Sequence, residues 1–275
     1  QRQRQEQRAV PLVLNPQDLS MLAWGFGVLC AEHFELQECT RSMLERLVVL
    51  AEQSMGSFQR HDLAQLALAL AKVGWDNPKL LESVAERSAG LLGTFSSQEL
   101  SNLAWAYAKL HHKNQGLMRA LPKCAQRVLD AGQFKPQELA NLAWALAVLD
   151  MPEQELLVGI FDRAQAARTA LTDMELRQLY QAYRMFHLVL PRPWPRLGRA
   201  FVRDMVSAWR AEKGRSKQSS YRHMAVSKML GLMRVAHENE SAHDIDIEIV
   251  GIGLKDEDWD FRGGAGGGGS GSSSS

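Results

Sequence analysis

The chain has few cysteines and no long apolar run. Its 275 residues include three cysteines, Cys30, Cys39 and Cys124, with no CxxC pair and no histidine at zinc-finger spacing. This usage argues against a disulfide framework or a zinc finger and predicts buried thiols in a reducing compartment. No run approaches the roughly eighteen consecutive apolar residues of a transmembrane helix, so we expect a soluble protein with no membrane partner.

The signatures of several enzyme classes are also missing. The sequence contains no P-loop, no Rossmann glycine fingerprint after a strand, no HExxH and no nucleophile elbow. The adjacent His111 and His112 follow a helix of the repeat described below and are predicted to lie in a surface turn, not in a metal site. We therefore expect a protein that is not an enzyme, with no catalytic residues, no metal and no cofactor.

The chain has enough apolar residues for a sizeable core, 45% of the total, but its two ends lie outside that core. A polar, low-complexity arm, QRQRQEQR, opens residues 1–14. Residues 263–275 are glycine and serine with one alanine, can bury nothing and are predicted to be disordered. Because the first residue is Gln1 and not Met, we expect a trimmed or processed chain in which a targeting peptide is not visible.

Five segments of the chain share one pattern. They are DLSMLAW ending at Trp24, DLAQLAL at Leu68, ELSNLAW at Trp105, ELANLAW at Trp144 and ELRQLYQ at Gln181. Their end positions are separated by 44, 37, 39 and 37 residues. That range is typical of helical hairpins that stack into solenoids, so the sequence predicts a repeat array over residues 15–190.

Each segment begins with residues that start helices. These are Asn15 and Pro16 before Asp18, Ser96 before Glu99, Pro136 before Glu138, and Thr172 before Glu175. A second helix follows in each unit, for example over Leu80–Leu92 and Gly116–Ala131. The predicted fold is all-α: a right-handed helical-hairpin solenoid of about five repeats, followed by a basic helix and a small α+β C-terminal segment.

A small residue and a large one recur side by side in the repeats. The alanines are Ala23, Ala67, Ala104 and Ala143, and in three repeats the next residue is Trp24, Trp105 or Trp144. A row of tryptophans can stack on nucleic-acid bases, but helical spacing beside leucine and alanine is more typical of a core. We predict that these tryptophans pack between neighbouring repeats.

An amide side chain recurs immediately before the second leucine of the pattern. The four amides are Gln65, Asn102, Asn141 and Gln178, and Met21 stands at this position in the first segment. Helical-repeat RNA-binding proteins read base edges with polar side chains at fixed repeat positions. The alternative is an amide ladder that satisfies backbone groups or caps between repeats.

The segments ELSNLAWAYAKLHH and ELANLAWALAVLD resemble the octotricopeptide repeat family of algal organelles and its relatives that carry a RAP domain. The resemblance covers roughly residues 15–185. It implies a helical-repeat protein that binds organellar RNA during processing, stabilisation or translation, or within an organellar ribosome. The proline-rich PPPEW signature of the family is absent from this sequence.

A second segment resembles the opening of a RAP domain. It runs through SSYRHMAVSKMLGLMRVAHENE from Ser219 to DIDIEIV, with a helix that carries Val226 and Leu230 and an acidic-apolar strand over Asp244–Ile247. No further core strand follows, so residues 219–262 are predicted to be a RAP-like remnant. Asp246 and Glu248 without a partner lysine do not make a metal nuclease, and we expect a solvated strand edge.

The net charge of +1 conceals two oppositely charged segments. Residues 184–234 hold twelve Lys or Arg against two acids, and residues 235–262 hold nine acids against Lys255 and Arg262. After three prolines, a basic amphipathic helix and loop are predicted over residues 191–218. Phe201 and Met205 lie on the side of this helix opposite its arginines.

Arginine suits phosphate because its planar guanidinium donates two parallel hydrogen bonds and stays ionised. The predicted phosphate-binding residues are Arg196, Arg199, Arg203, Arg210, Lys213, Arg215, Lys217 and Arg222. The alternative is a solvated face, or a surface that pairs with the acidic segment of the chain.

These observations favour an organellar RNA-binding protein, and first among such roles a structural component of a mitochondrial ribosome that stabilises ribosomal RNA. The expected partners are RNA, ribosomal RNA above all, and neighbouring proteins of a ribonucleoprotein particle. The alternatives are a maturation or stability factor for organellar RNA, or a protein-interaction scaffold that binds no RNA. We expect a mitochondrial location, with the chloroplast as the alternative.

Overall fold

The computed structural model describes residues 14–32, 37–189, 197–215, 237–239 and 247–249. The chain divides into two units, Gln1–Trp209 and Arg210–Ser275, which are treated separately. All described elements of the first unit are helices, which confirms the all-α prediction for the array. Among the described residues, no helix combines the length and apolar character that a membrane crossing requires.

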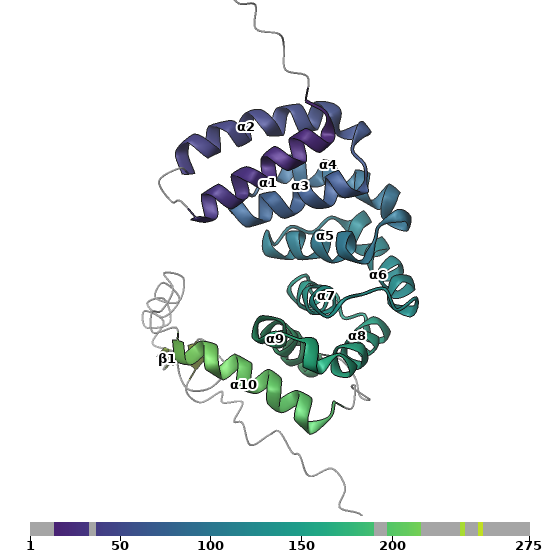
Figure 1. The fold of residues 1–275 in the computed structure, drawn as a ribbon, viewed down its shortest axis with the longest axis vertical. Coiled ribbons are helices and arrows are strands. Elements are labelled where there is room, and N and C mark those ends of the chain that lie inside the picture. The colour runs from purple at the N-terminus through teal and green to yellow at the C-terminus, as the bar shows by residue number, and fades with distance from the viewer. Residues whose placement is uncertain (1–13, 33–36, 190–196, 216–236, 240–246, 250–275) are drawn as a thin grey trace, which may run out of the picture. The chain divides into compact units, whose positions relative to one another are not determined.

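The first unit has two layers of helices (Figure 1). The first helices of the repeats are α1 (Pro16–Glu32), α3 (Arg60–Val73), α5 (Ser97–Lys109), α7 (Pro136–Val148) and α9 (Asp173–Val189). The second helices are α2 (Gln37–Ser54), α4 (Pro78–Leu91), α6 (Gln115–Asp130) and α8 (Gln154–Ala166). Within each layer a helix packs against its counterpart in the next repeat, so the array is a helical solenoid.

Short 3-10 helices close several of the repeats. They are η2 (Met55–Ser57), η3 (Leu92–Thr94) and η4 (Arg168–Ala170), which follow α2, α4 and α8. Phe58 and Phe95, directly after η2 and η3, are buried 37 residues apart. These two phenylalanines therefore mark the same position in successive repeats.

Each first helix begins with the same hydrogen bond. An acid at the third helical position accepts the backbone N–H of the residue before the helix, which satisfies a donor that the helix itself leaves free. The pairs are Asp18 with Asn15 (3.0 Å), Asp62 with Gln59 (3.0 Å), Glu99 with Ser96 (2.8 Å), Glu138 with Lys135 (2.9 Å) and Glu175 with Thr172 (2.6 Å). The predicted helix starts are thus confirmed, and the structure adds a fifth at Gln59.

The core lies between the two layers and between repeats. The recurrent alanines Ala23, Ala67, Ala104 and Ala143 are completely buried. Tyr107 is also completely buried, and its hydroxyl donates to the carbonyl oxygen of Leu81 at 2.6 Å. Burial raises the pKa of Tyr107 above its ordinary value, and the negative charge of Glu82 adds to the effect.

α10 (Arg199–Arg215) follows the array. Its side chains Phe201, Met205 and Ala208 are buried, so the predicted apolar side packs. Asp204 forms a hydrogen-bonded ion pair with Arg168, and Gly198 donates its N–H to Gln165 Oε1 at 2.6 Å. The first half of α10 is thereby tied to the segment that runs from α8 to η4.

In the second unit, β1 (His237–Asn239) pairs antiparallel with β2 (Ile247–Ile249). His237 lies opposite Ile249, and Glu238 lies opposite Glu248. Of the predicted strand Asp244–Ile247, only Ile247 falls within the described residues. The predicted helix with Val226 and Leu230 and the terminal segments 1–13 and 263–275 lie outside them.

Two predictions about single side chains have different outcomes. His111 lies in an exposed turn after α5 as predicted, with a positive φ of 52°, whereas His112 follows the turn and packs its ring against Tyr107 at 5.8 Å. Cys124 is partly exposed, so the prediction of a buried thiol is wrong for this residue, because it lies at the edge of the buried side of α6, between exposed Lys123 and buried Ala125. The side chains of Cys30 and Cys39 lie outside the described residues.

Candidate nucleic-acid interface

A groove of about 210 Å³ crosses the outer surface of α1, α3 and α5. Its lining residues are Trp24, His61, Ala64, Gln65, Leu68, Ser96, Gln98, Glu99 and Asn102. They come from three successive repeats, and equivalent positions of adjacent repeats, such as Gln65 and Asn102, lie side by side. Two of the four predicted base-reading residues, Gln65 and Asn102, are therefore brought together here.

The four recurrent amides fall into two pairs with different surroundings. Neither Gln65 nor Asn102 forms a side-chain hydrogen bond with another described residue, and both are partly exposed. Gln178 Nε2, in contrast, donates to Asn141 Oδ1 at 3.1 Å, and Gln178 Oε1 is buried without a hydrogen-bond partner among the described residues. The first pair has free amide groups at a groove, while the second pair forms the ladder considered as the alternative.

The recurrent tryptophans pack between repeats but are not fully covered. The rings of Trp105 and Trp144 have centroids 6.2 Å apart and are tilted by 36°, so they touch across two repeats as predicted. Trp144 Nε1 donates to Gln181 Oε1 at 2.9 Å in the following repeat. All three tryptophans are nevertheless partly exposed on the surface that carries the amides. The prediction that the tryptophans pack between repeats is thus confirmed for Trp105 and Trp144, and part of each ring also faces the open side of the first helices.

Two lysines that the sequence analysis did not single out lie on the same helix side. Lys72 Nζ sits 3.7 Å from the ring centroid of Trp24, a cation–π contact. Burial lowers the pKa of Lys72 from its ordinary value. Lys109 occupies the equivalent position on α5 and is exposed. These two lysines could have been found in the sequence by their spacing of 37 residues, which equals the repeat interval.

The one acid that lines the groove is paired. Glu99 is buried, and its Oε2 accepts hydrogen bonds from Ser96 N at 2.8 Å and from Arg60 Nη1 at 2.7 Å. His61 Nδ1 lies 3.8 Å from Glu99 Oε1. This carboxylate is therefore part of the helix start and of an ion pair, and it presents little free negative charge to a ligand.

α10 carries the other predicted site. Arg199, Arg203 and Arg210 are exposed, and their spacing places them on one side of the helix. Lys213 and Arg215 lie in α10, but their side chains are outside the described residues, as are Arg196, Lys217 and Arg222. The described part of the predicted phosphate site is thus a row of three arginines.

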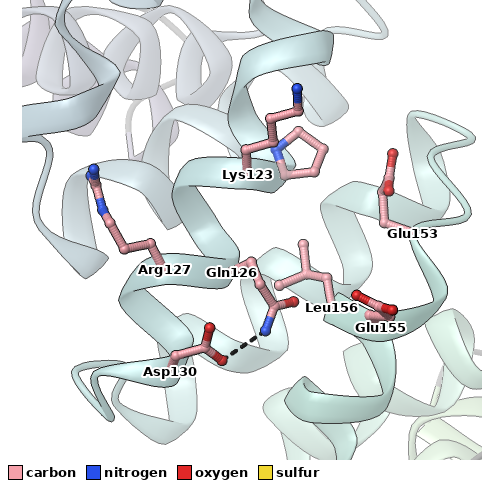
Figure 2. A pocket seen from close by; sticks show the side chains of 8 residues that line it. Lys123, Gln126, Arg127, Asp130, Glu153, Glu155 and Leu156 are labelled. Atoms are coloured by element: carbon pink, nitrogen blue, oxygen red, sulfur yellow. Dashed lines mark hydrogen bonds between the residues drawn. The ribbon is translucent and has the colours of Figure 1, made fainter.

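A second groove, of about 480 Å³, lies between α6 and α8 in the layer of second helices (Figure 2). Lys123, Arg127 and Asp130 come from α6, and Glu153 and Glu155 come from the start of α8 on the other side of the groove. Gln126 Nε2 donates to Asp130 Oδ1 at 2.8 Å, and Arg127 Nη2 donates to the carbonyl oxygen of Gly93 at 2.8 Å. With three acids against two bases, this groove does not favour a polyanion.

The described residues hold no cluster of histidine, cysteine, aspartate or glutamate side chains that could bind a metal ion. Two candidate surfaces for a nucleic acid lie on the described parts of the chain. One is the face of the first helices with Gln65, Asn102 and the tryptophans, and the other is the arginine row of α10.

Comparison with known proteins gives one family match. The family model described as RNA-editing substrate-binding complex 6 protein matches residues 36–154. No curated protein matches the chain. The matched segment extends from the residue before α2 to the first residue of α8, which is less than half of the chain. The central repeats of this chain are therefore similar to a family whose name refers to RNA editing.

Proposed function

We propose that this protein binds single-stranded RNA on the exposed side of its first helices, as an RNA-binding subunit of a ribonucleoprotein complex. The observation that carries the proposal is the groove where the Gln65 and Asn102 amides, without hydrogen-bond partners among the described residues, lie beside the Trp24 ring. Amides bond to base edges, and an indole ring stacks on a base. Single-stranded RNA exposes both its base edges and its base faces.

The charged side chains around the groove also favour an RNA ligand. Lys72 and Lys109 stand next to the tryptophans and can pair with phosphates, while Glu99 is neutralised by Arg60. A base that stacks on Trp24 displaces the Lys72 ammonium from the ring, and the released ammonium then meets the phosphate backbone. The arginines of α10 extend the phosphate-binding capacity.

The family match supports the same class of ligand. Its printed name refers to an RNA-editing substrate-binding complex, which favours a substrate-binding role in RNA processing over the ribosomal role placed first from sequence. The proposed compartment remains the mitochondrion, which rests on the octotricopeptide repeat resemblance. The role proposed here is binding and not catalysis, because the groove presents amides, an indole ring and a lysine to a ligand.

The test measures binding of labelled single-stranded RNA of randomised sequence, with duplex RNA and single-stranded DNA as competitors. The double variant Gln65→Ala/Asn102→Ala is expected to bind about tenfold more weakly, because each lost amide contact is worth about 0.5–1.5 kcal/mol. The matched control, Gln115→Ala/Gln126→Ala, removes two amides from α6 in the other layer and is expected to bind as the unmodified protein does.

Equal affinity of both double variants and the unmodified chain would show that this groove does not hold RNA. Crosslinking followed by sequencing of the bound RNA identifies the natural ligand. A dominant ribosomal RNA would favour the ribosomal role, and scattered transcripts a processing role. Recovery of no RNA would favour a protein scaffold.

A further inference from the structure

Three positions recur on the open side of the first helices, and their side chains change along the array. We call them the amide, tryptophan and lysine positions, which in α5 are Asn102, Trp105 and Lys109. Because adjacent first helices pack against each other, the five side chains of each position form a row across α1, α3, α5, α7 and α9. The chemistry of a row therefore shows which repeats offer a group to RNA.

The lysine row is basic only in its middle. Its side chains in chain order are Val28, Lys72, Lys109, Val148 and Met185. Lys72 and Lys109 are exposed, whereas α7 and α9 have a partly exposed valine and a 47% exposed methionine at this position. Valine and methionine have no donor for a phosphate oxygen. The phosphate contacts of this row therefore end at α5.

The amide row changes at the same boundary. Gln65 and Asn102 form no side-chain hydrogen bond with another described residue. The amides of α7 and α9 bond to each other instead, since Gln178 Nε2 donates to Asn141 Oδ1 at 3.1 Å. A base edge that bonds to Asn141 Oδ1 must compete with Gln178, so this bond disfavours base contacts beyond α5.

The tryptophan row offers a different ring contact at each end. Trp144 of α7 packs against Trp105 and donates its Nε1 hydrogen to Gln181 Oε1 at 2.9 Å. Against the ring of Trp24 lies the Lys72 ammonium, 3.7 Å from the centroid. A single lysine side chain leaves a ring face more readily than a packed and hydrogen-bonded indole. Stacking of a base is therefore favoured at Trp24 over Trp144.

Arginines appear on the far side of α9. Arg177 and Arg184 are partly exposed, and their equivalents in α7 are the buried Ala140 and Ala147. The earlier first helices also have small residues at these two positions, on the side that packs against the next repeat. The row of Arg199 and Arg203 on α10 follows in the chain. Cationic side chains thus return after α9, outside the three rows.

We propose that the RNA site covers three repeats and that the open side of α7 and α9 is a spacer, which the strand crosses without specific contacts. This inference rests on the proposed function. At one base per helical repeat, α1, α3 and α5 hold about three nucleotides, beside Trp24, Gln65 and Asn102. Their phosphates lie at Lys72 and Lys109. The ligand is thus a short single-stranded stretch, and the nucleotides over the spacer are not selected by sequence.

The first test measures affinity against length, with RNA oligomers of two to ten nucleotides and randomised sequence that compete with a labelled decamer at low salt. Affinity is expected to rise about 2- to 10-fold with each nucleotide up to three and to stay level at four and five. A second rise is expected from about six nucleotides, where a strand that has crossed the spacer meets the arginines.

The length series separates failure of the spacer from failure of the proposed function. A steady rise of affinity through five nucleotides would overturn the spacer and leave RNA binding by the groove intact. Trinucleotide binding is expected to be lost in Gln65→Ala/Asn102→Ala. If no oligomer bound, or if this variant bound trinucleotides normally, the groove would not be the RNA site and both proposals would fail.

The second test extends the lysine row with Val148→Lys/Met185→Lys. Both side chains are at least partly exposed, so the packing of the repeats is expected to be unchanged. The variant is expected to bind pentanucleotides more tightly than trinucleotides, which removes the plateau. Its slope of log affinity against log salt concentration for pentanucleotides is expected to steepen by about 1.4, since each added contact to a single strand contributes about 0.7.

The matched control is Val49→Lys/Leu50→Lys, which adds the same charge at two exposed positions of α2 in the other layer. It is expected to leave the ratio of pentanucleotide to trinucleotide affinity unchanged. Gln137, one turn before Asn141 on α7, is exposed, and Gln137→Ala is expected to bind pentanucleotides normally. Weaker binding by Gln137→Ala, or an equal ratio in the two lysine variants, would overturn the proposal.

Discussion

Gln178 donates a hydrogen bond from its Nε2 to Oδ1 of Asn141, so two equivalent positions of adjacent repeats are joined across 3.1 Å. This pair links α7 to α9, whereas the equivalent Gln65 and Asn102 on α3 and α5 have no such bond. One recurrent sequence position thus has two different uses. It joins repeats in the second half of the array and leaves polar groups available in the first half.

A double-mutant cycle on Asn141→Ala and Gln178→Ala is expected to give a coupling free energy of about 0.5–1.5 kcal/mol for unfolding in urea. The same cycle on Gln65→Ala and Asn102→Ala is the control and is expected to show no coupling. Coupling of equal size in both cycles would mean that the first pair also bonds in solution. Its amides would then be unavailable to a ligand.

Charge reversal on α10 is expected to weaken the binding of single-stranded RNA. It is also expected to make that binding less dependent on salt concentration. In Arg199→Glu/Arg203→Glu/Arg210→Glu, the loss of three phosphate contacts lowers the slope of log affinity against log salt concentration by about 2. The control Lys113→Glu/Arg119→Glu/Lys123→Glu makes the same change of charge at exposed positions at and near α6. Titrations at several salt concentrations check this, and equal slopes for both variants would refute a specific role of α10.

Gly159 on α8 leaves little room for a side chain. A Cβ at this position would lie 2.7 Å from Cδ2 of Leu129, and Leu129 is itself buried on α6. Gly159→Ala is therefore expected to lower the free energy of unfolding by about 1–3 kcal/mol, since the packed core must shift. Urea denaturation measures this loss.

The control for that substitution is Gly90→Ala on α4, where a Cβ meets nothing within 4 Å. It is expected to stabilise the protein by about 0.5–1 kcal/mol, because alanine loses less backbone entropy than glycine in a helix. If both substitutions stabilised the protein, the contact between α6 and α8 would be looser than described.

Tyr107 is expected to make stability depend on alkaline pH. Its pKa is raised by burial in the folded protein, so above about pH 10 the unfolded chain loses the phenolic proton while the folded chain keeps it. The free energy of unfolding then falls by about 1.4 kcal/mol per pH unit until the folded protein also ionises. This contribution is fully present below pH 10.

Tyr107→Phe removes that dependence together with the hydrogen bond to Leu81. Near neutral pH the variant is expected to be about 1 kcal/mol less stable than the unmodified protein, and the difference is expected to shrink as the pH rises above 10. Urea denaturation from pH 7 to 11 measures both. A constant difference over this range would show that Tyr107 ionises in the folded protein as it does in the unfolded chain.

The helix pairs could be predicted from sequence because their signals are local. Ser96 with Glu99, or Thr172 with Glu175, is a start signal complete within four residues. Gln59 with Asp62 forms the same box but was not singled out, because glutamine is an uncommon residue before a helix. The repeat unit could therefore be predicted from local signals, whereas the unusual cap at Gln59 was recognised only in the structure.

Exposure could not be predicted in the same way, because it depends on neighbours. Leu22 and Leu66 have the same surroundings in sequence, yet Leu22 is exposed and Leu66 is buried. The tryptophans stand on helices that are apolar on several sides, and only the packing decides which side stays open. The ion pair of Asp204 with Arg168 joins residues 36 positions apart and likewise required the fold.

The 37-residue interval from Phe58 to Phe95 allows a whole repeat to be removed or added. Removal of residues 59–95 would join Phe58 directly to Ser96, which recreates the present junction of Phe95 with Ser96, including the capped start of α5. A whole unit can therefore be lost or duplicated by a single genetic event without a new loop. Gain or loss of complete units therefore changes the length of the array while the next first helix keeps its capped start.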